Sequence, residues 1–134
     1  MAATLSEGVK KLFLERNFAH LATLMADGSP QVTPVWVDQE GERIVVNTAE
    51  GRVKPANVRR DPRVAISVYN QENPYSAAFV RGRVAEVRSG GAEAHIHKMA
   101  QKYMGQERYP NLQPGEQRLL LIIEPEYVGT MMVD

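Results

Sequence analysis

Apolar and polar side chains alternate along most of the chain, with a two-residue period that is typical of β-strands with one buried face. Clusters of Gly, Pro, Asp and Asn separate these stretches at short intervals and indicate turns. The pattern predicts six strands and allows a seventh at the C-terminal end. The six are expected over residues 18–25, 31–38, 43–48, 63–69, 77–88 and 118–124, and the seventh over residues 127–133.

Short turns join the first three of these strands. Asp27-Gly28 favours a hairpin because this dipeptide tolerates the positive φ angles of a tight turn, and residues 39–42 form a second polar turn. Three strands connected in this way predict an antiparallel meander. Pro34 lies inside the second strand and cannot donate to a strand ladder, so we expect an edge strand or a bulge there.

Three other segments follow the helical period. Thr4 and Glu7 have the spacing of a capping box in front of a short amphipathic helix. A second helix is expected over residues 49–60, where Asp61-Pro62 ends it. The third has apolar residues at positions i, i+4, i+7, i+8 and i+11, which form one buried helix face. These residues are Ala92, Ile96, Met99, Ala100 and Tyr103.

The order of the elements predicts a mainly β fold of the α+β class. The absence of β–α–β alternation argues against a doubly wound parallel sheet. We therefore expect an antiparallel barrel with short peripheral helices. The 134 residues are expected to form one domain over residues 1–134, which is too short for a TIM barrel or a two-domain nicotinamide dehydrogenase.

Charge and cysteine content narrow the possible functions. The 16 basic and 16 acidic side chains create no net field that would attract nucleic acid or an anionic membrane. The chain has no cysteine, which excludes disulfides, thiolate metal sites and cysteine nucleophiles. The longest apolar run, residues 119–123, is far shorter than the roughly 20 residues of a membrane span. The first residues lack the layout of a signal peptide, so a cytoplasmic, soluble protein is expected.

The strongest chemical signal is a basic stretch over residues 50–63. It holds five basic and two acidic side chains, an excess of +3 in a neutral chain, and it lies where a strand leads into a helix. A helix N-terminus offers free backbone N–H groups to an anion. Arg52 and Lys54 at that terminus would clamp a phosphate, one as a fork and one as a point charge. The alternative is a solvated basic helix face, which is what charge runs usually form.

No other residue pattern points to a catalytic group. His95 and His97 are two residues apart on a helix and point to different faces, and His20 lies alone in a strand, so none predicts a metal site. Serines and carboxylates lack the spacing of a nucleophile or an acid–base pair. Any enzyme activity would therefore need a cofactor that brings the reactive group. Trp36 follows Pro34-Val35 and is either a core aromatic or a wall for a flat ring.

Several short motifs follow one another between residues 18 and 110, and together they resemble a known family. In order they are His20-Leu21-Ala22-Thr23-Leu24, Asp27-Gly28-Ser29-Pro30-Gln31-Val32-Thr33-Pro34-Val35-Trp36, Asn47-Thr48, Arg52-Val53-Lys54, Asn57-Val58-Arg59-Arg60-Asp61-Pro62-Arg63, Asn73-Pro74-Tyr75, Val80-Arg81-Gly82, Lys102-Tyr103-Met104-Gly105 and Tyr109-Pro110. This series resembles the split β-barrel flavin and deazaflavin oxidoreductases, the pyridoxamine 5′-phosphate oxidase-like superfamily with the FMN-binding split barrel. It is most similar to the branch that binds the 8-hydroxy-5-deazaflavin coenzyme F420.

The resemblance implies a homodimer that binds one cofactor in each of two interface clefts and acts on a small molecule. The cofactor's ring would lie along Thr33, Pro34, Val35 and Trp36, and its ribityl and phosphate end would lie against Asn47, Thr48, Arg52 and Lys54. Arg59 or Arg60, with Asn57 in the same helix, would contact the anionic tail. The segment Tyr75, Ser76, Ala77, Ala78 and Phe79 would lie near the cofactor, from the same or the other subunit. The resemblance supplies no protein acid or base, because the reduced deazaflavin delivers the hydride from its C5.

The leading hypothesis is thus an F420-dependent oxidoreductase acting on a conjugated, electron-poor organic substrate. We weigh it against three alternative functions. An FMN-binding oxidase or reductase of the same fold is the nearest, and a non-catalytic cofactor carrier is another. Only the deazaflavin coenzyme has an oligoglutamate tail, so the additional cations Arg59 and Arg60 favour it over FMN. A nucleic-acid-binding barrel that uses Arg81 and Arg83 as well is disfavoured by the neutral net charge and the lack of clustered aromatics on a strand face.

Overall fold

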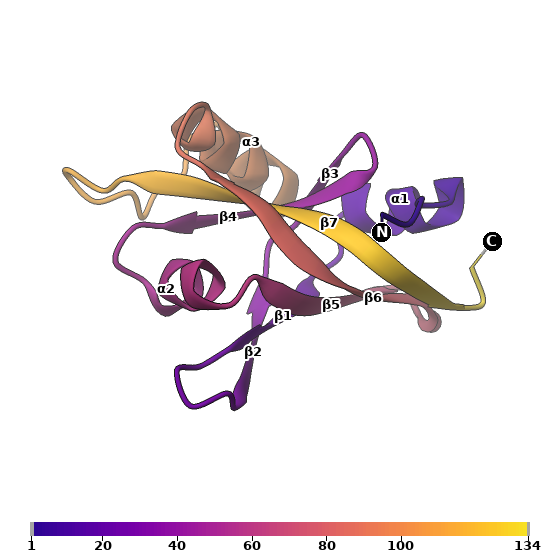
Figure 1. Cartoon of the computed structure of the whole chain (residues 1–134). Helices are drawn as coiled ribbons and strands as arrows, with labels where there is room; N and C mark the ends of the chain where they lie inside the picture. The colour runs from indigo at the N-terminus through magenta and orange to yellow at the C-terminus, as the bar shows by residue number, and fades with distance from the viewer. Residues whose placement is uncertain (1, 134) are drawn as a thin grey trace.

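A seven-stranded antiparallel sheet with three helices forms the molecule, and the computed structural model describes residues 2–133 (Figure 1). The strands are β1 (Ala19–Leu24), β2 (Pro30–Val35), β3 (Asp38–Glu40), β4 (Arg43–Ala49), β5 (Arg63–Asn70), β6 (Asn73–Arg88) and β7 (Arg118–Met131). The helices are α1 (Glu7–Leu14), α2 (Val53–Arg60) and α3 (Ala92–Met104). These elements confirm the predicted α+β class and the three short helices.

The strands follow the order β2-β1-β5-β6-β7-β4-β3, so β2 and β3 are the edge strands of a strongly curved sheet. No ladder joins these two edges within residues 2–133, so the sheet is a split barrel that does not close. Pro34 lies in β2, and the expectation of an edge strand at this proline is confirmed. A proline is tolerated there because its missing N–H leaves no ladder bond unmade on a solvent-facing edge.

The predicted meander of the first three strands is partly right. Both of its hairpins are confirmed, because β1 pairs antiparallel with β2 and β3 pairs antiparallel with β4. The continuous second strand is wrong, since it divides at Trp36 and Val37 into β2 and β3, and β4 pairs with β3 and β7 instead of β2. Side chains of α3 replace the missing ladder at this break. The Tyr103 hydroxyl accepts from the Val37 N–H (3.1 Å), and Lys102 Nζ donates to the Val37 carbonyl (2.6 Å). The chain therefore turns toward α3 where local sequence predicted a continuous strand.

Two further boundaries differ from the prediction. Ser6, and not Thr4, caps α1, because its hydroxyl oxygen accepts from the Val9 N–H (3.2 Å). The two strands expected at the C-terminal end form one long strand, β7, which pairs with β6 along most of its length. Its ladder is interrupted opposite Gly82, where a Cβ atom would lie 2.2 Å from the Glu124 carbonyl oxygen. A glycine is required there because any side chain would collide with backbone.

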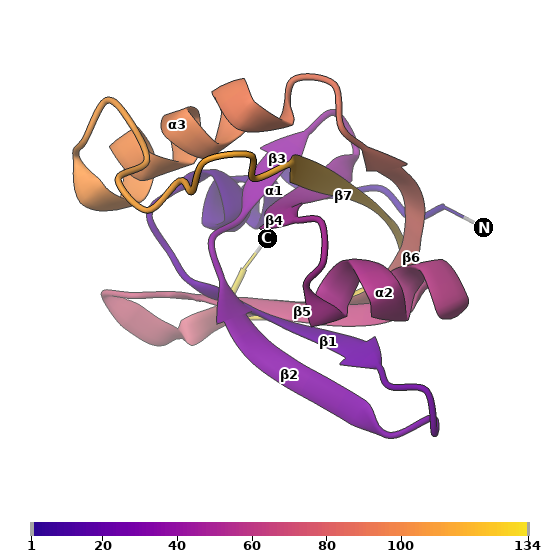
Figure 2. The ribbon, with the colours of Figure 1, turned by 90° about the vertical axis from the view of Figure 1, so that its left-hand side faces the viewer.

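The core lies on both sides of β7, because its residues from Arg118 to Ile123 are all buried. Leu121 and Ile123 pack into the main core with Phe13 of α1 and Ile66 of β5. Leu120 and Ile122 point the other way, toward Ala92 at the start of α3. The helices α2 and α3 and the hairpin of β1 and β2 surround one end of the molecule (Figure 2). Among residues 2–133, none of the helices has the length and apolar composition needed to cross a membrane.

Candidate functional site

A cavity of about 280 Å³ lies between β2, β4, α2, α3 and the loop that follows α3. Seven of its lining residues belong to the cofactor site predicted from the sequence: Pro34, Val35, Trp36, Asn47, Thr48, Arg52 and Lys54. The other lining residues are Ile96, Met104, Tyr109, Asn111 and Arg118. The fold thus brings the expected ring-binding and phosphate-binding segments to one cavity, although ten residues of chain separate Trp36 from Asn47 in the sequence.

Aromatic rings form one wall of this cavity. Trp36 stacks on Tyr103 of α3, with ring centroids 5.2 Å apart and planes only 8° from parallel. Tyr109 meets Trp36 edge-on at 5.9 Å. The Tyr103 hydroxyl is buried and donates to the Asn17 carbonyl (2.7 Å), and burial raises the pKa of Tyr103 to about 12. Because Tyr103 is locked in this way, Trp36 is held in a fixed orientation as a flat apolar surface.

Trp36 therefore combines the two roles considered from the sequence, a core aromatic and a wall for a flat ring. One of its faces packs in an aromatic cluster with Tyr103, and the residue also lines the cavity. Tyr109 is held by its backbone, because its N–H donates to Nδ1 of His97 (2.9 Å). His97 is thus a packed histidine that fixes the loop after α3, and Nε2 of its ring is buried with no hydrogen-bond partner.

The opposite end of the cavity is basic. Arg52 is the N-cap residue of α2 and Lys54 lies in the first turn, which contains no acidic residue. Lys54 is partly buried, and burial together with the positive charge of Arg52 lowers its pKa. Arg52 has only a distant ion pair, 4.0 Å from Glu116. Among residues 2–133, no carboxylate lies within salt-bridge distance of Lys54, so this ammonium group has no counter-ion of its own.

Arg118 is a third cation of the cavity, and the sequence analysis missed it. Its side chain is only 3% exposed, and it donates from Nε to Asn47 Oδ1 (2.9 Å) and from Nη1 to Glu116 Oε2 (2.9 Å). Its guanidinium carbon also lies 5.4 Å from the centroid of the Tyr109 ring. One signal could have found it, since it directly precedes the apolar run 119–123 and so enters the interior with that strand.

Three predicted residues of α2 lie outside this cavity and have partners in the protein. Asn57 is buried and donates to Thr23 Oγ1 (2.9 Å). Arg59 pairs with Glu50 (2.5 Å), and that carboxylate raises the pKa of the guanidinium. Arg60 donates to the Leu24 carbonyl (3.3 Å) and to Asn57 Oδ1 (3.2 Å). Asn57 is therefore a packing residue, and the two arginines stabilise the surface of α2.

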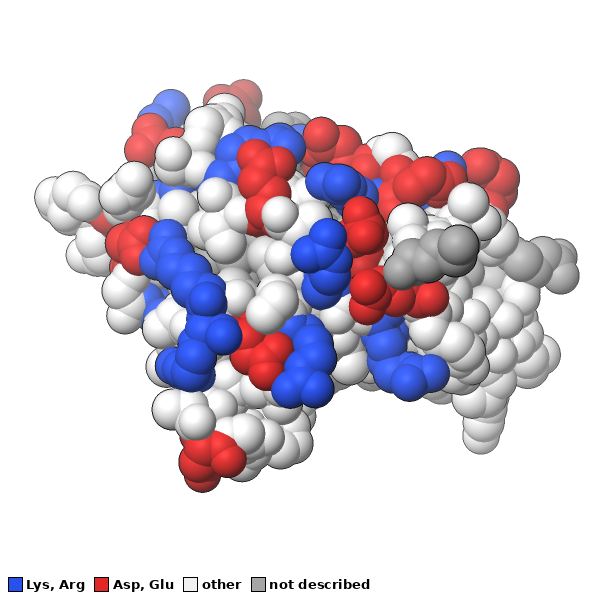
Figure 3. Space-filling view, viewed as in Figure 1, with Lys and Arg blue, Asp and Glu red and all other residues white. Residues whose placement is uncertain are grey.

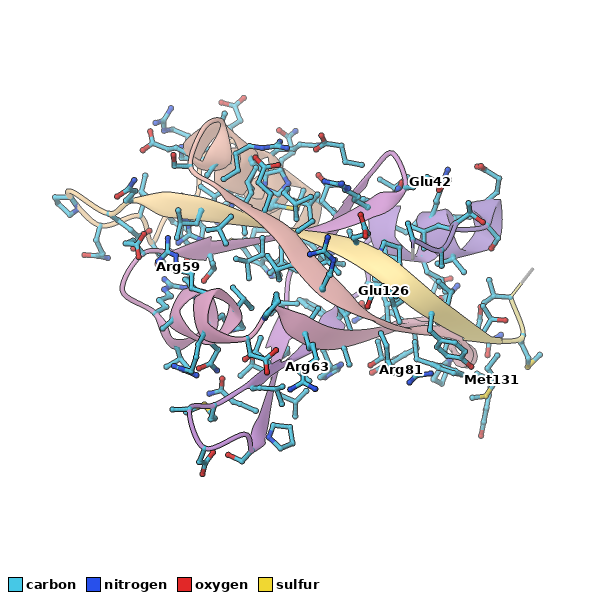
Figure 4. The ribbon with its side chains drawn as sticks, in the orientation of Figure 1. Glu42, Arg59, Arg63, Arg81, Glu126 and Met131 are labelled. Atoms are coloured by element: carbon cyan, nitrogen blue, oxygen red, sulfur yellow. The ribbon has the colours of Figure 1, made fainter. Side chains whose placement is uncertain are left out.

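On the outer surface around α2 and β5, basic side chains likewise lie beside acidic ones. Figure 3 shows acidic side chains beside the basic ones over these two elements. Arg59 belongs to α2 and Arg63 is the first residue of β5 (Figure 4), and Arg63 donates to both carboxylate oxygens of Asp61. The basic stretch of the sequence is thus divided: its beginning enters the cavity, and its end is neutralised on the surface.

The remaining predicted residues lie on other parts of the sheet. Thr33 in β2 does not line the cavity, but its Oγ1 atom is buried without a hydrogen-bond partner. Residues 75–79 of β6 lie away from the cavity of the same chain, and Tyr75 and Phe79 are 67% and 43% exposed. Ala78 alone of this segment is buried in the core. A cofactor in this cavity would contact this segment only if a second subunit presented it.

The chemistry available in the cavity is binding and orientation. Its lining includes cations, amides and aromatic rings, but no carboxylate, histidine, serine or thiol. Within the described residues, no group of three or more His, Cys, Asp or Glu side chains could hold a metal ion. A cavity that combines an aromatic wall with a group of cations, one of which (Lys54) has no carboxylate partner among the described residues, fits a ligand with a flat ring at one end and an anionic group at the other.

Comparisons with known proteins show the family of the chain. The family model described as pyridoxamine 5′-phosphate oxidase matches residues 5–132. A solved structure named F420 Reductase has a TM-score of 0.82 and 30% sequence identity, and the match covers 93% of this chain and 98% of the other. None of the curated protein sequences matches the chain.

More distant structures share the fold. A conserved hypothetical protein from Mycobacterium tuberculosis, Rv2991, has a TM-score of 0.73 at 19% identity, covering 97% of this chain and 86% of that one. HupZ from Group A Streptococcus has a TM-score of 0.68 at 18% identity, covering 95% and 94%.

Proposed function

Because the chain belongs to the pyridoxamine 5′-phosphate oxidase family, we propose that it is an oxidoreductase that uses coenzyme F420 and acts on a conjugated organic substrate. Two observations support F420 as the cofactor. The solved structure named F420 Reductase matches over nearly the full length of both chains at 30% identity. The cavity also combines an aromatic wall with a basic end, as a phosphorylated deazaflavin requires.

The observation that carries the proposal is the state of Lys54. A partly buried ammonium next to a second cation is unfavourable unless an anion compensates both charges. Lys54 and Arg52 are in this situation at the N-terminus of α2, where the backbone N–H groups of the first turn also point outward. A phosphoryl group at this position would accept hydrogen bonds from all three sources.

FMN is the alternative cofactor, because it also carries a flat tricyclic ring and a phosphate. The sequence argument that favoured F420 used Arg59 and Arg60 as contacts for the anionic tail. Both side chains have partners within the chain, so this argument is weakened. The preference for F420 therefore rests on the similarity to the F420 reductase structure.

Each wall of the cavity has a role in this proposal. When bound, the reduced coenzyme would supply the hydride from its C5. Trp36 and Tyr109 would fix the plane of the ring, while Pro34 and Val35 would exclude water from one side of it. Orientation of this kind contributes up to about 7–11 kcal/mol to a rate in favourable cases. The lining has no carboxylate or histidine, and Lys54 is assigned to the phosphoryl group, so we assign the proton to solvent.

We also propose a two-fold symmetric homodimer, because one face of the sheet presents exposed apolar side chains. In the strand register, Val32, Ala22, Ala65, Arg81 and Tyr127 lie side by side across five strands, and the next row contains Pro34, His20, Ser67, Phe79 and Gly129. Val32, Phe79 and Tyr127 are 63%, 43% and 47% exposed. Such a face marks an interaction site. Pro34 joins this face to the cavity, so a partner seated there would bring its residues 75–79 toward the cofactor.

The test of cofactor choice is a parallel titration with F420 and FMN. Trp36 is the single tryptophan and lines the cavity, so its fluorescence reports occupancy directly. We expect F420 to bind more tightly than FMN. An FMN affinity at least tenfold higher, equivalent to about 1.4 kcal/mol, would contradict the proposal. Reduction of a conjugated enone at saturating F420 then separates an enzyme from a carrier, which would bind without turnover.

The dimer is tested by mass measurement in solution at micromolar concentration. An obligate dimer interface buries more than about 2,000 Å² in total. A dimer with such an interface should persist on dilution. A monomer that still binds the cofactor would contradict the dimer proposal without affecting the assignment of the cavity.

A further inference from the structure

A line of hydrogen bonds connects Arg118 in the cavity wall to Asp38, which does not line the cavity. Arg118 donates from Nε to Asn47 Oδ1 (2.9 Å), and Asn47 Nδ2 lies 3.0 Å from Nδ1 of His95. The other ring nitrogen of His95, Nε2, lies 2.9 Å from Oδ2 of Asp38. Four side chains from β7, β4, α3 and β3 are therefore connected in series.

The neighbours of Asn47 fix the direction of every bond in this line. An arginine Nε can only donate, so the Asn47 atom facing it must be the oxygen. The amide nitrogen then donates to the Ala92 carbonyl (2.9 Å) and to His95. His95 Nδ1 must accept, so the ring proton of the neutral imidazole is on Nε2 and is donated to Asp38.

Solvent has little access to this line. The side chains of His95, Asp38 and Arg118 are 10%, 5% and 3% exposed. Although burial alone would raise the pKa of Asp38, hydrogen bonds from His95, the Gln39 N–H and Lys98 together keep it low. Asp38 is therefore the negatively charged end of the line, and Arg118 is the positively charged end. Water cannot easily replace a bond that is lost here, so each partner constrains the next.

We propose that His95, held by Asp38, is a positioning residue for Arg118. Arg118 donates Nε to Asn47 and only Nη1 to Glu116, in contrast to the bidentate pair of Arg59, so its Nη2 group is the part proposed to bind an anion in the cavity. The proposal rests on the proposed function, because it takes the anion to be the phosphoryl group of a bound cofactor. His95 and the Ala92 carbonyl both accept from the Asn47 NH₂ group and so hold the amide in the orientation that presents Oδ1 to Arg118. Without His95 only the Ala92 carbonyl holds this orientation, and in the rotated amide the NH₂ group would oppose the Arg118 N–H.

Substitutions at His95 test this proposal against a purely structural role. His95→Leu removes the acceptor for Asn47, and we expect F420 affinity to fall about tenfold, the scale of one hydrogen bond to a charged group. His95→Asn restores an acceptor oxygen near the position of Nδ1 and should stay within about threefold of the unmodified protein, because the bond to Asn47 is re-formed. Lys98→Met is the matched control, since Lys98 also donates to Asp38 (3.1 Å) but does not contact Asn47.

Equal losses in all three variants, or a lack of rescue by His95→Asn, would overturn the proposal. Melting temperatures confirm that each variant is folded before its affinity is compared. The affinity at the basic end is measured with inorganic phosphate as a second probe, so that the result does not depend on which ring system binds.

Nitrogen-15 NMR of the free protein provides an independent measurement. It should show His95 protonated at Nε2 and not at Nδ1, and the Arg118 Nε–H should exchange slowly with solvent. His95→Leu should accelerate that exchange, whereas Lys98→Met should not. If the protein binds neither F420 nor FMN while these signals behave as stated, the proposed function fails and the positioning role stands. Protonation of His95 at Nδ1 in the free protein at neutral pH would overturn the positioning role itself.

Discussion

The two ends of α2 have the same kind of side chain and very different surroundings. At the N-terminal end, Lys54 is partly buried, has no carboxylate partner among the described residues and faces a cavity. At the C-terminal end, Arg59 is exposed and pairs with Glu50, and Arg60 donates to the Leu24 carbonyl. Only four residues separate Lys54 from Arg59 in the sequence. The difference shows that the partners of a basic residue, more than its charge, decide whether it is available to a ligand.

The two ends of α2 differ in how much they gain from binding an anion. A guanidinium that already has a bidentate carboxylate partner gains little from a second anion, because that anion would compete with the first. An ammonium group that has lost part of its hydration without gaining a partner keeps the full interaction free energy with a bound anion, because no other anion competes for it. We therefore expect substitutions at the two ends of α2 to affect cofactor binding very differently.

The largest expected effect is at Lys54. Lys54→Ala should weaken F420 binding about 10- to 150-fold, corresponding to about 1.5–3 kcal/mol for a hydrogen bond to a charged group. Arg59→Ala, the matched variant at the other end of the helix, should change the affinity less than about twofold. Fluorescence titration of both variants measures this contrast. Equal losses in the two variants would refute the distinction between the two ends.

A smaller effect is expected at the next pair of residues. Arg52→Ala should weaken binding about 3- to 10-fold, because this side chain is half exposed and its interaction with an anion is screened by water. Arg60→Ala should leave the affinity within about twofold, and it should lower the melting temperature because Arg60 caps a backbone carbonyl. Calorimetry and titration of the same samples separate the two effects. A larger loss of F420 affinity in Arg60→Ala than in Arg52→Ala would reverse the assignment of the two ends.

Removing the partner of Arg59 tests whether pairing or position keeps this residue out of the site. Glu50→Gln frees the guanidinium without moving it into the cavity. We expect the F420 affinity to rise less than about threefold, through loss of a nearby negative charge alone. A tenfold gain would mean that a freed Arg59 reaches the ligand, as the sequence analysis proposed for the anionic tail.

The smallest effect concerns protons. The pKa of Lys54 in the free protein is lowered by burial and by Arg52. A bound anion stabilises the charged ammonium and raises that pKa, so binding at alkaline pH should take up a fraction of a proton. Titration calorimetry in buffers of different ionisation enthalpy measures this uptake, which should disappear in Lys54→Met. Proton release on binding would have the wrong sign for this account.

Local sequence patterns predicted most of the elements and the two hairpins of the N-terminal half, but not the break in the second strand or the pairing of distant strands. Alternation and turn residues located β1, β5 and the three helices to within a few residues. The error in the meander arose because Tyr103 and Lys102, which lie 66 and 65 residues from Val37, bond to its backbone where the second strand was expected to continue. Such a contact leaves no signal in the residues around Val37, so no local pattern could predict the break.

The same distinction holds for the site. Arg52 and Lys54 could be predicted because their role follows from a local feature, a helix N-terminus that lacks acidic residues. Arg118 and Tyr109 could not be placed in the same way, since the strand pairing and the loop after α3 bring them to the cavity. The pairing of Arg59 with Glu50 was equally hidden, because it depends on the geometry of the turn before α2.

The most direct test of the central claim is a crystal structure of the protein with F420 bound. We expect a phosphoryl oxygen within hydrogen-bond distance, about 3.2 Å or less, of Lys54 Nζ. We also expect the deazaflavin ring to lie against Trp36 and Arg59 to remain paired with Glu50. A phosphoryl group bound by Arg59 or Arg60, with Lys54 still unpaired, would contradict the central claim.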